Sequence, residues 1–163
     1  MKIIGIDPGL SGAVAVLENN KVLNIYDMPV MSEGKKNKRQ LNSALLVDLI
    51  KENILENEEV IVVVEQVNAM PGQGVTSMFN FGQTFGAIKG ISAALELPIF
   101  LVRPSKWKKH FELINSSKDS SRTKAIEMYP KLSSQKKKKK DVNKSDAILI
   151  ARFFSETRLT EGN

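Results

Sequence analysis

The chain has 163 residues, of which 42% are hydrophobic and 26% charged, the proportions of a globular protein with a sizeable core. Its formal net charge of +6 favours an anionic partner, nucleic acid before a membrane surface. The absence of cysteine, the single histidine and the lack of a long apolar run exclude disulfides, thiolate or multi-histidine metal sites and a membrane span. We therefore expect one soluble, cytoplasmic domain over residues 1–163.

The first third of the chain predicts three strands in an antiparallel meander. The apolar segment KIIGID is the first strand, and GAVAVLEN and KVLNIYDMP follow it with the short turn ENNK between them. The basic stretch SEGKKNKRQ predicts a loop. Apolar residues at helical spacing in LNSALLVDLIKENILE then predict a helix.

The rest of the chain alternates strands and helices. VIVVVEQV predicts a central strand covered on both faces, and PIFLVRP predicts a fifth strand. Helices are expected over SMFNFGQTFGAIKGISAALEL, SRTKAIEMY and SDAILIARFFSETRL, and a short helix or turn over SKWKKHFEL. Gly82, Gly86 and Gly90 recur every four residues, which leaves one helix face bare for close approach of another element. This order predicts an α/β fold with a five-stranded mixed sheet, the later strands parallel, flanked by helices.

Three acidic residues border apolar segments. Asp7 ends the first predicted strand, Glu65 ends the most apolar one, and Asp146 opens the last predicted helix in KSDAILIA. If the strands of Asp7 and Glu65 are parallel neighbours, both carboxylates emerge at the carboxyl edge of the sheet, and a helix packed there could add Asp146. Clustered carboxylates repel one another unless a cation neutralises them, and hard oxygen ligands favour Mg²⁺ or Mn²⁺.

Each acid also has a structural interpretation that spacing alone leaves open. An Asp before Pro-Gly is common in turns, so Asp7 could cap the turn at Pro8 and Gly9. An Asp in the first turn of a helix interacts favourably with the helix dipole, which could explain Asp146. Glu65 has no such routine role after VIVVV, so it weighs most toward a catalytic site.

The segments that carry these acids resemble a known family. IGIDPGLSGA, VVVEQV and the C-terminal KSDAILIA, in that order, resemble the RuvC-type Holliday junction resolvases of the ribonuclease H-like superfamily. FGQTFGAIKG resembles the glycine-spaced helix after the catalytic Glu of that family, and RPSKWKKHF and SRTKAIEMYP resemble its phage and bacterial RuvC-like branch. The resemblance covers essentially the whole chain and implies a ribonuclease H-like fold.

The resemblance implies a homodimeric, metal-dependent endonuclease that cuts four-way DNA junctions symmetrically and leaves 5′-phosphate and 3′-hydroxyl ends. Asp7, Glu65 and Asp146 match the metal-binding acids of the family, with Asp7 expected to bridge two Mg²⁺ or Mn²⁺ ions. Two ions about 3.5–4 Å apart can activate a water and stabilise the leaving oxygen. The family places a fourth ligand three residues before the last Asp, where this chain has Asn143. We expect Asp141 to take this role, with Asn143 as the alternative.

Basic residues gather in clusters, any one of which could be a solvated face. We expect phosphate contacts from these residues: Lys35, Lys36, Lys38, Arg39, Arg103, Lys106, Lys108, Lys137, Lys138, Lys139 and Lys140. The lysine run leads into Asp141 and Asp146, where a Lys could hold the scissile phosphate. Trp107 could stack on a base, or it could anchor a short helix to the core. Met70 is a candidate for the apolar wedge that the resemblance implies at the junction centre.

Other functions remain open. The phosphate loop of actin-like ATPases and sugar kinases also resembles GIDPGLSGA, but those proteins bind nucleotide between two such domains. The nearer alternatives are a nuclease for flaps or forks and a catalytically impaired junction-binding protein, the latter because of Asn143. The sequence does not identify a branch-migration helicase partner.

Overall fold

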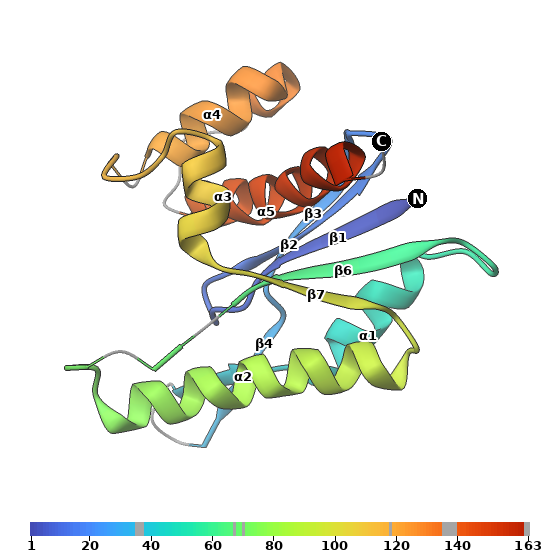
Figure 1. Cartoon of the computed structure of the whole chain (residues 1–163). Coiled ribbons are helices and arrows are strands. Elements are labelled where there is room, and N and C mark those ends of the chain that lie inside the picture. The colour runs from blue at the N-terminus through green and yellow to red at the C-terminus, as the bar shows by residue number, and fades with distance from the viewer. Residues whose placement is uncertain (35–37, 67, 70, 118, 135–139, 162–163) are drawn as a thin grey trace.

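A five-stranded mixed sheet forms the centre of the computed structural model, which describes residues 1–34, 38–66, 68–69, 71–117, 119–134 and 140–161. The strand order is β3-β2-β1-β6-β7 (Figure 1). Three strands form the predicted antiparallel meander: β1 (Lys2–Asp7), β2 (Ala13–Glu18) and β3 (Lys21–Asp27). Two strands extend the sheet parallel to β1: β6 (Val60–Glu65) and β7 (Ile99–Val102). The predicted α/β fold with a mixed sheet is confirmed.

Helices cover both faces of this sheet (Figure 1). On one face lie α1 (Ser43–Glu52) and α2 (Val75–Ala94). The other face carries α3 (Pro104–His110), α4 (Ser120–Met128) and α5 (Lys140–Glu161), with a 3₁₀ turn over Pro130–Ser134. Each face has its own apolar core, which explains why β1, β2 and β6 are buried almost throughout. No helix in the described part of the chain is long and apolar enough to cross a membrane.

The helix α5 packs directly on β1 because Gly5 has no side chain. A Cβ at Gly5 would collide with the backbone oxygen of Ala147 and with the side chain of Ala151. Small residues on both elements therefore bring the two backbones together. This close packing holds the first half of α5 against the strand that ends at Asp7.

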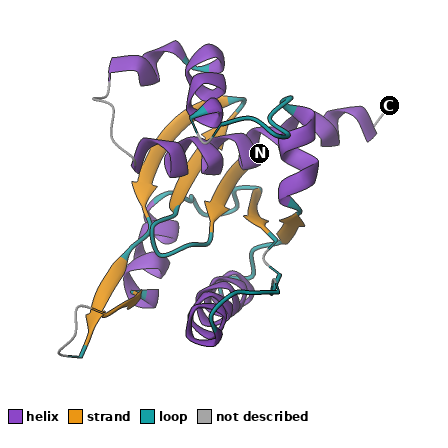
Figure 2. Cartoon of the chain, turned by 90° about the vertical axis from the view of Figure 1, so that its left-hand side faces the viewer, coloured by secondary structure: helices purple, strands orange, loops and turns teal. Residues whose placement is uncertain are grey.

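Two elements differ from the sequence-based expectation. The basic stretch predicted as a loop contains a hairpin of β4 (Val30–Glu33) and β5 (Lys38–Leu41), which projects from the main sheet (Figure 2). Its strands lack the apolar alternation that marks a half-buried strand, because the ribbon is largely exposed. The helix α5 begins at Lys140, about one and a half turns before the expected start at Ser145, since its polar first residues carry no apolar periodicity.

Candidate active site at the carboxyl edge of the sheet

Strand register brings Asp7 and Glu65 together. Ile6 of β1 is paired with Val64 of β6, so the residues that follow them lie side by side at the carboxyl edge of two parallel strands. Side chains alternate between the faces of a strand. Ile6 and Val64 belong to the core beneath α1 and α2, so Asp7 and Glu65 project toward the opposite face, where α3 and α5 pack. The expectation that these strands are parallel neighbours is confirmed.

The third acid, Asp146, reaches this edge from α5. Its neighbour Ala147 packs against Gly5 of β1, which fixes the height of Asp146 above the sheet. The Ser121 hydroxyl of α4 lies near the Asp146 carboxylate and lowers its pKa. Its Oδ1 atom is buried and has no hydrogen-bond partner among the residues that the structure describes. A buried carboxylate oxygen without a partner is costly, and a cation would relieve that cost.

The helix start matters for the interpretation of Asp146. Because α5 begins at Lys140, Asp146 lies in the second turn rather than the first. The helix dipole stabilises acids mainly within the first turn. The dipole therefore does not explain an acid at this position, and its proximity to Asp7 and Glu65 is the better reason for its presence.

The three carboxyl groups interact electrostatically. Burial, followed by the negative charges of Glu65 and Asp146, raises the pKa of Asp7 from 3.8 to about 7, although a Gly9 N–H and Lys108 oppose the shift. Burial also raises the pKa of Asp146 to about 6, with a further contribution from Glu65. The pKa of Glu65 is raised by burial as well. Such coupled, desolvated acids are typical of functional sites.

The donor chemistry of the cluster fits a hard divalent cation. Within the described residues, no three His, Asp or Glu side chains lie close enough together to hold one ion, so the acids form no closed cage. Mg²⁺ commonly takes one or two carboxylates and completes its octahedron with waters and substrate phosphates. The unpartnered Oδ1 of Asp146, with the coupled carboxylates of Asp7 and Glu65, supplies oxygens of that kind.

The turn after Asp7 is tied to both the site and α5. The Gly9 N–H donates to Asp7 Oδ1 at 3.3 Å, so Asp7 caps the turn as well as facing the other acids. A Cβ at Gly12 would collide with the backbone oxygens of Asp7 and Gly9, which makes glycine necessary there. The Asn143 amide of α5 donates to the backbone oxygen of Ser11. The turn and α5 therefore constrain each other beside the carboxylates.

Asn143 and Asp141, the two candidates for a fourth ligand, lie on different faces of α5. Asn143 and Asp146 are three residues apart and share one face of α5, whereas Asp141 lies about 140° around the axis from Asp146. Asn143 also contacts the turn that follows Asp7. The side chain of Asp141 lies outside the described residues, so its assignment as a ligand stays a prediction.

The residues Trp107 and Lys108 of α3 lie next to the acids. Trp107 is fully buried, with 0% of its surface exposed, and its Nε1–H donates to Glu65 Oε1 at 2.9 Å. The expectation that Trp107 stacks on DNA is wrong for this structure, because its ring is enclosed by the core; the alternative, a core anchor, is correct. Lys108 lies with its Nζ 5.3 Å from the Trp107 ring centre, and its positive charge lowers the pKa of all three acids.

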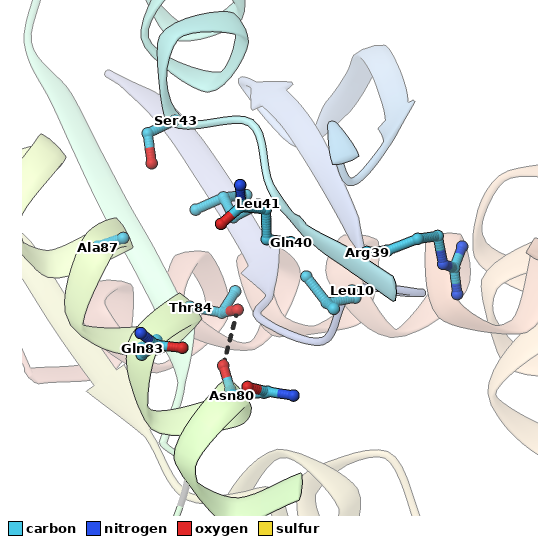
Figure 3. Close-up of a pocket in the computed structure, with 9 residues that line it drawn as sticks. All are labelled: Leu10, Arg39, Gln40, Leu41, Ser43, Asn80, Gln83, Thr84 and Ala87. Carbon is cyan, nitrogen blue, oxygen red and sulfur yellow. Dashed lines mark hydrogen bonds between the residues drawn. The ribbon is translucent and has the colours of Figure 1, made fainter. Parts of the chain in front are cut away.

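The β4–β5 hairpin brings Arg39 to the same turn. Its guanidinium lies 3.5 Å from the Ser11 hydroxyl. Arg39 borders two cavities, one of about 310 Å³ between Leu10, β5 and α2 (Figure 3), and one of about 660 Å³ that reaches Asn143. In the first cavity, Thr84 donates to the backbone oxygen of Asn80. The sequence predicted Arg39 as a phosphate contact on a loop, but neither its position beside this turn nor the hairpin that carries it.

The remaining predicted DNA contacts divide into two groups. Lys38, Arg103 and Lys106 are exposed, and Arg103 and Lys106 border an open groove of about 550 Å³ beside β7. Those outside the described residues are Lys35, Lys36, Met70, Lys137, Lys138, Lys139 and the side chain of Lys140. Ser121 was not predicted as a site residue, because its proximity to Asp146 arises from the packing of α4 on α5 and leaves no local signal in the sequence.

The overall fold occurs in known DNA-junction enzymes. No protein-family model and no curated protein matches the sequence. RuvC from Thermus thermophilus is similar over 97% of each chain, with a TM-score of 0.60 and 16% identity. The same protein in complex with a Holliday junction substrate gives a TM-score of 0.64 at 13% identity over 96% of each chain. Fowlpox virus resolvase, in complex with Holliday junction DNA, gives 0.53 at 16% identity over 95% of this chain and 99% of that one. The chain therefore has the RuvC-type, ribonuclease H-like fold.

The raised pKa values predict that the metal-free protein loses stability as the pH rises from about 4 to 7. In this window the folded state retains protons that the unfolded state releases, so raising the pH favours unfolding. The variant Asp7→Asn removes the buried carboxyl group with the most strongly raised pKa. It should therefore increase the free energy of unfolding at pH 8 by on the order of 2–4 kcal/mol. Denaturant unfolding from pH 4 to 8 measures this, with exposed Asp48→Asn as the control. A D7N protein no more stable than wild type at pH 8 would contradict the buried-charge account.

Proposed function

We propose that this chain is a metal-dependent endonuclease that resolves four-way DNA junctions by symmetric phosphodiester hydrolysis. The observation that carries the proposal is the convergence of Asp7, Glu65 and Asp146, desolvated and electrostatically coupled, at the carboxyl edge of a RuvC-type sheet. The similar Thermus and Fowlpox virus proteins are described in complex with Holliday junctions, which supports a branched-DNA substrate. The expected cations are Mg²⁺ or Mn²⁺, two in each active site.

Each residue of the site has a definite task in this proposal. Bound divalent cations would lower the pKa of an attacking water and offset charge on the phosphodiester. Asp7 is coupled to both other acids, so it is the natural shared ligand, with Glu65 and Asp146 on either side. The positive charge of Lys108 lies near all three acids and would stabilise a phosphate brought to this edge. Hydrolysis by a water needs no covalent nucleophile from the protein.

Basic side chains around the carboxyl edge support DNA binding. Arg39 lies beside the turn that follows Asp7, and Arg103 and Lys106 lie at and near the start of α3. The lysine run at 136–140 leads into α5 in the sequence, its last residue being the first of the helix, and we propose that it contacts phosphate as well. Such contacts position the DNA but carry little sequence information.

A homodimer would supply the two active sites that symmetric cutting requires, and the exposed face of α2 is suited to form it. This 20-residue helix buries Thr84, Ile88 and Ser92. Its opposite face spans about 80° and consists of Val75, Phe79, Gly82, Gly86 and Gly90. Val75 and Phe79 are 79% and 65% exposed, and a Cβ at the three glycines would meet nothing within 4 Å in the described chain. An apolar, glycine-lined helix face permits close packing against the same face of a second copy.

A junction-binding protein with impaired catalysis is the second candidate. Asn143 occupies the position at which the family resemblance implies a charged or metal-binding side chain, and its amide holds the turn at Ser11 instead. A neutral amide oxygen binds a cation less strongly than a carboxylate. Cleavage activity separates the two candidates, because both bind the junction.

The variants Asp7→Asn and Glu65→Gln are expected to reduce cleavage of a four-way junction in Mg²⁺ by at least 1,000-fold, an order-of-magnitude figure for loss of the charge-stabilising centre. Junction affinity measured in Ca²⁺ should remain within about threefold, because the isosteric amides preserve shape. Asp48→Asn is the control for a general effect of removing an acid. Retained cleavage in either variant would exclude the carboxylate cluster as the active site.

Comparing the substrates tests the specificity. An intact four-way junction, a fork, a flap and a linear duplex are incubated with wild-type protein in Mg²⁺. Junction resolution predicts paired, symmetric cuts on the four-way substrate and little cutting of duplex. Preferential cutting of flaps or forks would favour the alternative nuclease, and binding without cutting would favour the impaired protein.

Asn143→Ala is expected to lower cleavage about 10–100-fold, the usual effect of removing an outer-shell partner, whereas Asp141→Asn should stay within about threefold of wild type. The reason is that Asn143 shares the face of Asp146 and anchors the turn after Asp7. Initial rates across a Mg²⁺ titration give the measurement. The reverse ranking would assign the fourth position to Asp141.

Gly86→Leu should convert a dimer into a monomer while leaving the fold intact. A larger side chain blocks close helix approach, yet its Cβ meets nothing within 4 Å in the described chain, and leucine has higher helix propensity by up to about 1 kcal/mol. Sedimentation velocity measures the oligomeric state, and thermal unfolding measures the fold. Ala44→Leu on the exposed face of α1 is the matched control. A G86L protein that remains dimeric would remove α2 from the interface.

A further inference from the structure

Trp107, the only tryptophan of the chain, makes a single specific contact through its polar atom. Its Nε1–H donates to Glu65 Oε1 at 2.9 Å, while the ring is completely enclosed in the core between the sheet, α3 and α5. Indole has one donor and no acceptor, so its hydrogen-bonding capacity is fully used on this carboxylate. A phenylalanine could fill much of the same volume, but it would lack this hydrogen-bond donor.

Backbone geometry leaves the indole little freedom to point elsewhere. Glu65 is paired with Val102 of β7, and the Gln66 N–H donates to the Val102 oxygen at 2.8 Å. After β7 the chain passes directly into α3, whose first residue is Pro104. The helix that carries Trp107 therefore starts beside the strand end that carries Glu65, and both partners are held by rigid elements.

The contact orients the carboxylate without neutralising it. Since the indole N–H uses one lone pair of Oε1, the second oxygen of Glu65 is the freer one for a ligand. A neutral donor satisfies a buried oxygen but adds no net positive charge, so it does not replace a bound cation as a lysine would. The same hydrogen bond lowers the pKa of Glu65 against the effect of burial.

We propose that Trp107 is a positioning residue that holds the Glu65 carboxylate, through the Nε1–Oε1 hydrogen bond, in the orientation that binds the catalytic cation. The inference rests on the proposed function in one respect, that Glu65 is a metal ligand. Loss of an outer-shell partner of this kind typically reduces metal affinity 10–100-fold. Trp107→Phe is expected to show a loss in that range.

A spectroscopic test examines the contact directly. A single tryptophan gives a single indole N–H signal in a ¹H–¹⁵N NMR spectrum, so the signal needs no assignment by mutation. A hydrogen bond to a carboxylate should move the proton downfield, and Glu65→Ala should move it back toward the position of an unbonded indole. In wild-type protein the signal should shift saturably with Ca²⁺, and in E65A this response should disappear. An indole signal unaffected by E65A would overturn the proposal.

An affinity test examines the consequence. Trp107→Phe should require 10–100-fold more Ca²⁺ for half of the full rise in melting temperature, and a similar excess of Mg²⁺ for half-maximal junction cleavage. Phe85→Leu is the matched control, because it also removes packed aromatic volume but lies on α2, on the opposite face of the sheet from Trp107. The control should lower the melting temperature without changing either metal requirement. Equal metal requirements in W107F and wild type would overturn the proposal.

The two proposals fail separately. If the wild-type protein binds Ca²⁺ and its indole signal responds, but no junction is cut, the proposed function fails and the positioning role of Trp107 stands. If junctions are cut while E65A leaves the indole signal in place, the positioning role fails alone. Should W107F not fold, the comparison of wild-type, E65A and Glu65→Gln spectra still decides, because E65Q keeps a neutral acceptor and should give an intermediate shift.

Discussion

The repulsion among three buried carboxyl groups is the constraint to which the rest of the fold responds. Asp7, Glu65 and Asp146 disfavour one another's ionised forms, and burial adds to that cost. Left to side-chain preference alone, these groups would turn outward to water. The protein keeps them together by placing each on a backbone that is fixed by unrelated interactions: Asp7 and Glu65 by strand register, and Asp146 by helix packing on β1.

The smallest residues of the first strand and of α5 set the distances in this arrangement. Gly5 allows Ala147 and Ala151 to lie directly against β1. The distance between α5 and the sheet is therefore short, and Asp146 lies close to the strand ends. Gly12 then lets the chain reverse tightly after Asp7, so that Ser11 meets Asn143 on α5. The chemistry of the edge therefore depends on positions that carry no functional group. A substitution at Gly5 would displace Asp146, six residues after the start of α5, without contacting it directly.

The strands and two of the acids could be predicted because their signals are local. VIVVVE and KIIGID are apolar runs that each end in a carboxylate, and parallel pairing of two such strands puts the acids at one edge. The β4–β5 hairpin and the first residues of α5 could not be predicted, since exposed polar segments carry no hydrophobic periodicity. Gly82, Gly86 and Gly90 form one bare face of α2, as their spacing predicted, but the expected close approach of another element is not seen in the described part of the chain.

The role proposed for Trp107 could not be predicted from the sequence, for a different reason. Its neighbours Lys106 and Lys108 place it in a basic stretch that is typical of a nucleic-acid contact, and only the passage from β7 into α3 turns its ring inward. Once there, the indole and the adjacent lysine act on Glu65 in complementary ways. Lys108 lowers the cost of negative charge at the edge from the half-exposed side, whereas Trp107 satisfies one oxygen from the buried side without contributing net charge. A second cation in place of the indole would have relieved the repulsion within the protein and removed the electrostatic reason for a divalent ion to bind. A neutral donor leaves that attraction in place, which is why an indole rather than an ammonium suits the buried side of a carboxylate that has to remain available to a metal.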